Sequence, residues 1–235
     1  FSINFALICF FHRIPILTKS GYVHAGSLGT ILLASIGLGG WLSVVVYLVL
    51  GSFVTKLGFS KKKKNGLAEA RDGKRGPENV WGSSATGALL AIFINLDLWP
   101  NYLLLVGFAA SFTSKLADTF GSEIGKSWGT KAILITSFRE VPGGTEGAIS
   151  LEGTLASLLG GFIMAISMRS LGIISSSQMT ILVAIVGFLA TLIESVIGAL
   201  AQNRFRYLSN EVVNFIQTSI AAIMAIAFAY TLDIA

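Results

Sequence analysis

Cysteine, histidine and charged residues are all scarce in this sequence. Its 235 residues include one cysteine, Cys9, and two histidines, His12 and His24. A single cysteine excludes an internal disulfide framework and any metal cluster built on several cysteines. Both histidines lie far in sequence from any carboxylate, so we interpret them as packing or interfacial residues rather than metal ligands. Charged residues make up 12% of the chain, about half the share in a typical soluble domain, which argues against a soluble protein.

Apolar residues take the place of the missing charge. Hydrophobic residues make up 53% of the chain, the mean hydropathy is +0.75, and long apolar runs recur from end to end. A membrane-spanning helix needs about 20 such residues, and the roughly ten-residue alternation of a membrane β-barrel is missing. We therefore predict an all-α fold, a polytopic bundle of about eight transmembrane helices that forms one integral-membrane domain over 1–235. The predicted spans are 1–17, 22–38, 40–57, 80–97, 101–125, 151–171, 178–200 and 210–232.

Positive charge is distributed unevenly among the predicted loops. If the N-terminus lies on the non-cytosolic side, every Lys and Arg except Arg169 and Lys115 falls in a cytosolic loop or at the cytosolic end of a span. This matches the positive-inside rule and predicts that both termini are non-cytosolic. The two long loops, 58–79 and 126–150, are then cytosolic, and we expect them to carry function. The sequence begins at Phe1 without an initiator methionine, which leaves open a removed leader segment.

Polar residues also occur within the predicted spans, where a charge at the bilayer centre costs roughly 2.5–3.5 kcal/mol. Helical spacing predicts polar stripes on three spans: Ser111, Lys115, Asp118 and Ser122 on the fifth, Glu194, Gly198 and Gln202 on the seventh, and Glu211, Asn214 and Thr218 on the eighth. Such stripes can line a functional site. They can also be structural, because i,i+3 pairs neutralise each other and small polar residues join helices.

The stretch "GSEIGKS" at the end of the fifth predicted span resembles a phosphate-binding P-loop. That motif needs four residues between its first glycine and the Gly-Lys pair, and a strand before it. Here Gly121 and Gly125 enclose three residues and follow a membrane helix, so we reject a P-loop. The small residues Gly121, Gly125 and Gly129 still leave room for a phosphate to approach the backbone, and Lys126 and Lys131 add positive charge.

Both long loops combine basic and acidic residues. The run Lys61–Lys64 is interpreted as a juxtamembrane anchor to anionic lipid. Lys74 and Arg75 are flanked by glycines and precede a predicted helix, which favours a phosphate site. Glu146 and Glu152 surround another helix start, where acids can also act only as caps. Basic loops beside carboxylates at the membrane edge suggest phosphates held with Mg²⁺, because carboxylates and phosphate oxygens are its usual ligands.

Several long stretches carry a resemblance to a known family. They read "GLAEARDGKRGPENVWGSSATGAL", "ADTFGSEIGKSWG", "VPGGTEGAISLEGTLASLLG" and "ESVIGALAQ" followed by "LSNEVVNFIQT". In this order, from about Thr18 to Thr218, they resemble the integral-membrane family of unknown-function domain 92, which includes a plant phytyl-phosphate kinase. More remotely, "ADTFGSEIGKSWGTK" and "TEGAIS" are similar to the dolichol and phytol kinases, which are membrane kinases that use CTP.

The resemblance implies an activity and a set of site residues. The activity is a kinase that converts phytyl phosphate to phytyl diphosphate for tocopherol and related prenyl-lipid synthesis, with CTP as the expected donor and Mg²⁺ as the metal. Asp118 and Glu123 would be the metal-binding or catalytic carboxylates, with Lys126 beside them. The expected nucleotide and phosphate contacts are Lys74, Arg75, Glu78, Asn79, Ser122, Gly125, Glu146, Gly147, Ser150 and Glu152, and the pocket is completed by Glu194, Asn210 and Asn214.

We therefore expect three partners, an isoprenoid-phosphate lipid, a nucleoside triphosphate and membrane lipid, and no nucleic acid. The expected location is a bacterial inner membrane or a plastid membrane, with the active site on the cytosolic or stromal side. Two alternatives stay open. A CTP-dependent cytidylyltransferase would release pyrophosphate instead of CDP, and a lipid-phosphate or anion transporter would place ionisable groups at the bilayer midplane within an inverted repeat. The D-x-x-D-G aspartate cluster of the CDP-alcohol phosphotransferases is absent.

Overall fold

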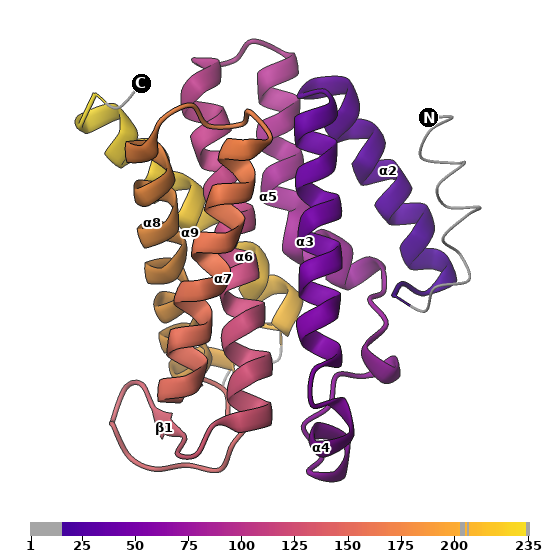
Figure 1. Cartoon of the computed structure of the whole chain (residues 1–235), viewed down its shortest axis with the longest axis vertical. Coiled ribbons are helices and arrows are strands. Elements are labelled where there is room, and N and C mark those ends of the chain that lie inside the picture. The colour runs from indigo at the N-terminus through magenta and orange to yellow at the C-terminus, as the bar shows by residue number, and fades with distance from the viewer. Residues whose placement is uncertain (1–15, 203–204, 206, 234–235) are drawn as a thin grey trace.

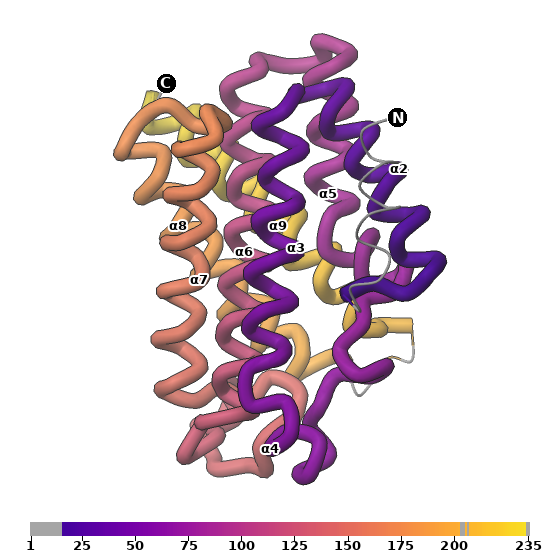
Figure 2. The backbone as a smooth tube through the Cα atoms, turned by 45° about the vertical axis from the view of Figure 1, so that its right-hand side comes forward, coloured from indigo at the N-terminus to yellow at the C-terminus, as the bar shows by residue number. Residues whose placement is uncertain are grey.

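The computed structural model describes residues 16–202, 205 and 207–233, and this part of the chain forms a helical bundle. Its long helices pack against one another along the long axis of the molecule (Figures 1 and 2). A short helix α4 (Phe59–Lys64) and a 3-10 turn η1 (Arg71–Gly73) lie in the first long loop. The long helices are α2 (Lys19–Ser35), α3 (Leu38–Lys56), α5 (Pro77–Asn95), α6 (Asn101–Trp128), α7 (Leu151–Ser170), α8 (Ser177–Ile197), which continues into a π-helical turn η2 (Gly198–Gln202), and α9 (Asn210–Thr231).

The predicted spans from residue 22 onward each correspond to one of these helices, with ends that differ by about three residues at most. The first predicted span, 1–17, lies almost entirely outside the described residues, as do Cys9 and His12. By length and composition, five of the described helices can cross a membrane: α3, α6, α7, α8 with η2, and α9. Helix α2 has 17 residues, and the first turns of α5 are polar. The count of eight spans and the sidedness of the termini therefore stay predictions.

The outer faces of the bundle are apolar and suited to lipid. Leu155, Leu159 and Ile166 follow one face of α7 and are exposed, and Ile181 and Ile185 do the same on α8. The spacing of three to four residues places each set on one side of its helix. A continuous apolar outer face of this kind belongs in hydrocarbon rather than in water.

Helix α6 is the centre of the bundle. It contacts α3, α5, α7, α8 and α9. In its most apolar 18-residue stretch, 89% is buried inside the bundle. Its seam with α7 depends on small residues that allow the two backbones to approach. A methyl group added to Gly160 would lie 2.7 Å from the ring of Phe120, and one added to Gly121 would clash with Ser157. Part of the glycine pattern in "GSEIGKS" therefore serves helix packing.

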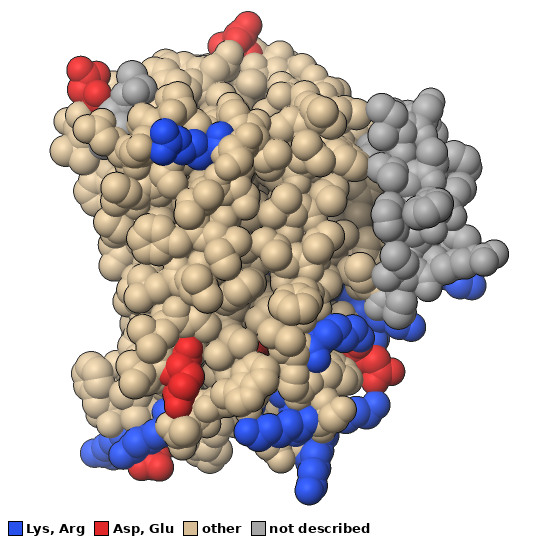
Figure 3. Space-filling view, viewed as in Figure 1, with Lys and Arg blue, Asp and Glu red and all other residues tan. Residues whose placement is uncertain are grey.

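The two long loops fold over one end of the bundle. The second loop holds two antiparallel strands of two residues each, β1 (Ile133–Leu134) and β2 (Ala148–Ile149), the only strands in the described part. The first loop is tied to the chain before α2, because the Thr18 N–H donates to the Arg75 carbonyl at 3.0 Å. Most of the charged side chains visible in Figure 3 gather at this loop end, and a broad uncharged band separates them from a few charged side chains at the opposite end. The predicted concentration of charge on one side of the bundle is confirmed.

Candidate functional site

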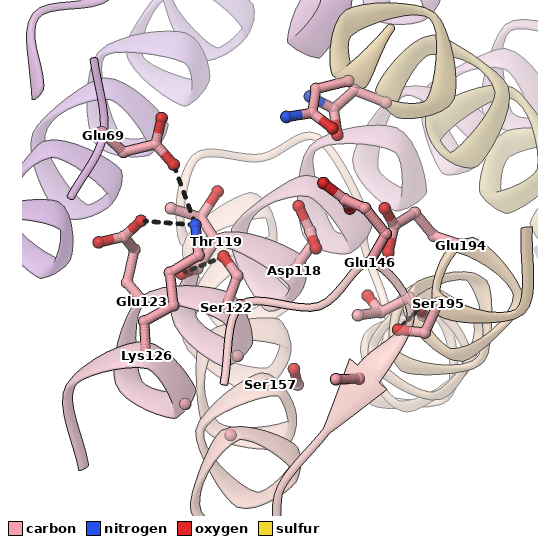
Figure 4. Close-up of a pocket in the computed structure, with 18 of the residues that line it drawn as sticks. Glu69, Asp118, Thr119, Ser122, Glu123, Lys126, Glu146, Ser157, Glu194 and Ser195 are labelled. Atoms are coloured by element: carbon pink, nitrogen blue, oxygen red, sulfur yellow. Dashed lines mark hydrogen bonds and ion pairs between the residues drawn. The ribbon is translucent and has the colours of Figure 1, made fainter. Parts of the chain in front are cut away.

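A polar cavity of about 440 Å³ lies at the charged end, between the long helices and beneath both loops (Figure 4). Its walls come from α5, α6, α7, α8 and α9 and from the loops that precede α5 and α7. Five basic side chains line it: Arg71, Lys74, Arg75, Lys115 and Lys126. Six acidic side chains also line it: Glu69, Asp118, Glu123, Glu146, Glu194 and Glu211. A bundle with few charges thus concentrates many of them in one hollow.

Three helices begin at this cavity. Residues of the first turns of α5, α7 and α9, among them Asn79, Ser150 and Asn210, form part of its wall. The Ser150 hydroxyl accepts the Gly153 N–H at 3.1 Å as the cap of α7, and the Asn79 side chain accepts the Gly76 N–H at 2.9 Å at the start of α5. A helix N-terminus carries a partial positive charge and free N–H groups, which favour phosphate. Three of them around one hollow favour a polyanionic ligand.

Arg75 is held firmly at the wall of the cavity. Its N–H donates to the Ile16 carbonyl at 3.0 Å, and its guanidinium donates to the Tyr47 hydroxyl at 2.5 Å while lying 5.1 Å from the Tyr47 ring centre. Gly51 makes room for it, because a methyl group there would lie 2.8 Å from a guanidinium nitrogen. A cation fixed in advance loses little entropy when it binds an anion.

Lys115 places a second cation deep in the bundle. The residue is buried, with 6% exposure. Its ammonium forms an ion pair with Asp118, one turn along α6, and donates to the Asn214 side chain of α9 at 2.8 Å. A buried charge needs such partners because desolvation is costly. The i,i+3 neutralisation considered from the sequence is thus confirmed, and it lies within the cavity wall.

Lys126 links the loop before α5 to α6. Its ammonium lies 3.3 Å from Glu69 and 3.9 Å from Glu123. Burial works to raise the pKa of Glu69, but the Lys126 ammonium, with smaller contributions from Arg75 and Lys115, holds that pKa below its usual range. Burial raises the pKa of Glu146 in the second loop, and the Asp118 and Glu69 carboxylates add to the effect while Lys126 opposes it.

Asp118 and Glu123 point in different directions. Glu123 lies with Glu69 and Lys126 on one side of the cavity, and Asp118 lies toward Glu146 and Glu194 on the other (Figure 4). Five residues along a helix correspond to a rotation of about 140°, so the spacing alone separates the two carboxylates. The structure therefore does not bring the predicted pair together, and the sequence already held the signal that it would not.

The carboxylate of Glu123 has a buried partner from the lysine run. Lys62, fully buried on α4, forms an ion pair with Glu123 and donates to the Thr55 carbonyl at 2.8 Å. Lys61 donates to the Ser127 carbonyl at 2.6 Å. The interpretation of the whole run as a lipid anchor is therefore wrong for Lys62, whose charge is used inside the fold to fasten α4 to α6.

Most of the predicted site residues line the same cavity. They are Lys74, Arg75, Asn79, Asp118, Ser122, Glu123, Gly125, Lys126, Glu146, Gly147, Ser150, Glu194, Asn210 and Asn214. Glu78 and Glu152 do not line it. Glu78 forms an ion pair with Arg71, and Glu152 accepts the N–H and hydroxyl of Thr130 at 3.1 and 2.7 Å. These two acids support the loops rather than face the hollow.

Four further charged residues line the cavity without having been predicted as site residues. Glu69 and Arg71 belong to the same charged stretch as Lys74 and Arg75, so its dense charge was the available signal. Lys115 and Glu211 fall in the polar stripes of their helices. Periodicity shows which residues share a face but not which neighbouring helix that face meets.

The donor set of the cavity fits Mg²⁺ bound together with phosphates. Asp118, Glu146 and Glu194 lie on one side of it (Figure 4), yet the described residues contain no group of three or more His, Cys, Asp or Glu able to hold a metal by themselves. Mg²⁺ is usually held by one or two carboxylates plus substrate phosphates. When all of these side chains are ionised, the six acidic ones in the wall outnumber the five basic ones. A bound polyphosphate would add more negative charge, which a cation would have to balance.

Comparison with known proteins gives the family. The model of the family described as "Integral membrane protein DUF92" matches residues 2–222. The chain belongs to this family. It is accordingly an integral membrane protein, as the apolar outer faces of its helices indicate.

Relatives from three organisms are similar over most of this chain. An uncharacterized membrane protein of the cyanobacterium Synechocystis is 47% identical over 92% of this chain and 84% of its own length. Protein VTE6, chloroplastic, of Arabidopsis thaliana is 43% identical over 89% of this chain, which spans 64% of the length of that relative. An uncharacterized membrane protein of Methanocaldococcus jannaschii is 31% identical over 92% of this chain. No solved structure matches significantly.

Proposed function

We propose that this protein is a membrane kinase that phosphorylates an isoprenoid monophosphate, with phytyl phosphate as the expected acceptor and CTP as the expected donor. The family resemblance implies this activity and its role in prenyl-lipid synthesis, and the similarity to a chloroplastic plant protein supports a plastid membrane as one location. The active site would be the polar cavity, on the cytosolic or stromal side of a bacterial inner membrane or a plastid membrane.

The observation that carries the proposal is the construction of the cavity. Three helix N-termini and the cations Arg75, Lys115 and Lys126 surround one hollow at the end of an apolar bundle. Positive helix ends and basic side chains are the groups that bind phosphate. A hollow at the end of a membrane bundle is also where a lipid phosphate and a water-soluble nucleotide can meet.

Phosphoryl transfer requires mainly that the two substrates are positioned and that the charge of their phosphates is neutralised. An oxygen of the acceptor phosphate attacks the γ-phosphorus of the nucleotide, the bond from that phosphorus to the bridging oxygen breaks, and the nucleoside diphosphate leaves. The acceptor is already an anion, so no strong base is required. Arg75 and Lys115 would hold the lipid phosphate on the side that adjoins the bundle, and Lys74 and Lys126 would contact the nucleotide near the loops. One or two of the carboxylates of Asp118, Glu146 and Glu194 would hold Mg²⁺ together with phosphate oxygens, and the bound ion would neutralise phosphate charge.

The deciding experiment uses the purified protein in detergent with phytyl phosphate, CTP and Mg²⁺. We expect phytyl diphosphate and CDP, and we expect EDTA to abolish their formation until Mg²⁺ is restored. Release of pyrophosphate instead of CDP would identify a cytidylyltransferase. No turnover with any nucleoside triphosphate by a folded protein would refute the enzyme proposal, and uptake of the lipid phosphate or its headgroup by proteoliposomes would then identify a transporter.

A further inference from the structure

An apolar groove lies beside the polar cavity, between α8 and α9. Leu189, Leu192, Ile193 and Val196 of α8 and Met224 of α9 line it, and its volume is about 310 Å³. The four α8 residues recur at helical spacing and form one stripe, which extends about 10 Å along the helix at a rise of 1.5 Å per residue. Leu189 is 39% exposed, so the groove opens to the lipid-facing surface.

The groove and the polar cavity share a wall. Leu192 lines both hollows, and Phe188, one turn before it on α8, lines the polar cavity. These two residues are among the few large apolar side chains in a wall otherwise built of charged, polar and small residues. Glu194 and Ser195, which follow closely, also face the polar cavity. The wall thus changes from polar to apolar within two turns of α8.

We propose that this groove holds the part of the substrate's isoprenoid chain that follows its first isoprene unit. The inference rests on the proposed function, because it takes the phosphate to lie in the polar cavity. A chain attached to a phosphate there has to leave through an apolar part of the wall, and Leu192 joins that wall to a groove lined only by apolar side chains. The chain of a lipid whose phosphate lies in the polar cavity reaches this groove directly at Leu192, so we assign the substrate chain as its occupant.

The groove orients the chain rather than concentrating it. Lipid tails are as apolar as leucine side chains, so no hydrophobic force drives a chain from the bilayer into the groove. Close packing along the stripe instead gains dispersion contacts and fixes the direction of the phosphate relative to the nucleotide, which governs the rate of transfer. The groove therefore acts on long-chain acceptors and not on acceptors too short to reach Ile193.

The first test fills the groove. Ile193→Trp should lower kcat/KM about tenfold for a twenty-carbon isoprenyl monophosphate and leave kcat/KM unchanged for a five-carbon isoprenyl monophosphate. The matched control is Ile185→Trp, two turns earlier on α8, exposed to lipid and outside the groove, which should leave both values unchanged. Equal losses for the two substrates, or no loss for either, would overturn the assignment of the groove.

The second test does not depend on turnover. A twenty-carbon isoprenyl monophosphate that carries a diazirine in its second or third isoprene unit is irradiated with the wild-type protein, and the labelled residues are mapped by mass spectrometry. Labelling of the α8–α9 groove that unlabelled isoprenyl phosphate suppresses would support the groove even if the wild type proved to have no kinase activity. Labelling elsewhere, or labelling that is not suppressed, would overturn it even if the kinase activity stands.

Discussion

Asp118 is the carboxylate on which the proposed chemistry depends most. It lines the cavity on the side of Glu146 and Glu194, and it also forms the ion pair that holds the buried Lys115. In the proposed mechanism a single residue would therefore combine a contact to a bound cation with the placement of a phosphate-binding lysine. Asparagine keeps an oxygen that can accept from Lys115, as the Asn214 side chain does, but it removes the counter-ion of a buried charge, so some loss of stability accompanies the loss of activity.

We expect Asp118→Asn to lower kcat by about 10²-fold or more, the loss seen when one group that stabilises transition-state charge is removed. The measurement is CDP formation by the purified variant, with thermal unfolding as the check on folding. Glu140→Gln is the control, because Glu140 is exposed and paired only with Lys131 at 3.1 Å among the described residues. A near-normal rate in Asp118→Asn would show that the site is misplaced.

The Lys62–Glu123 pair offers a test of a second carboxylate. Removing one partner leaves a buried charge without its counter-ion, which costs about 3–5 kcal/mol. Lys62→Met should therefore lower the unfolding temperature strongly, and Lys62→Met combined with Glu123→Gln should restore most of the loss. Thermal unfolding in detergent measures both. If Glu123 also acts in catalysis, as predicted, the stable double variant still forms CDP slowly. A normal rate of CDP formation would show that Glu123 serves only to hold α4.

At the level of elements, the cavity exists because α6 and α7 approach closely at one seam. Gly121 and Gly153 lie where the backbones nearly touch, and Gly160 faces the Phe120 ring. This contact brings the start of α7, with Ser150, against the inner end of α6. The position of one helix N-terminus in the wall thus follows from glycines that do not themselves need to bind anything.

Two adjacent glycines of α7 test this account of the seam. Gly160→Ala should destabilise the protein by about 1–3 kcal/mol, because its methyl group would lie 2.7 Å from Phe120. Gly161→Ala should be neutral or stabilising by up to about 1 kcal/mol through helix propensity, because its nearest neighbour would be 3.6 Å away. Thermal unfolding of the two variants measures the difference. Equal changes in stability would contradict the close contact of α6 and α7 at this seam.

At the level of the whole molecule, the asymmetry of charge predicts the orientation in the membrane. Both loops that cover the cavity lie at the charged end, and Asp97 follows α5 at the opposite end of that helix. The positive-inside rule then predicts that the loops lie in the cytosol or stroma. That placement would give the cavity access to nucleotides.

Cysteine labelling tests the orientation. In a Cys9→Ser background, a cysteine at exposed Glu140 should react with a membrane-impermeant maleimide only from the cytosolic side, and a cysteine at exposed Asp97 only from the other side. Intact cells and inverted vesicles supply the two sides. Labelling of both positions from one side would contradict the bundle topology, and the reverse pattern would contradict the orientation.

The sequence by itself determined the membrane class, the positions of the helices from residue 22 onward and the concentration of charge at one end. These depend on local properties, namely the length of apolar runs, helical periodicity and the composition of loops. The charged stretch from Glu69 to Arg75 also marked one wall of the cavity.

Only the tertiary structure decided which polar residues meet. Lys62 and Glu123 are far apart in the sequence, as are Arg75 and Tyr47. The first pair forms where α4 packs on α6, and the second where the loop before α5 packs on α3. The roles of Glu78 and Glu152 as supports of the loops likewise depend on their partners, Arg71 and Thr130. The position of a residue along a helix determines the direction of its side chain around the helix axis. Which neighbouring helix that side chain faces depends on how all the helices pack together in the bundle.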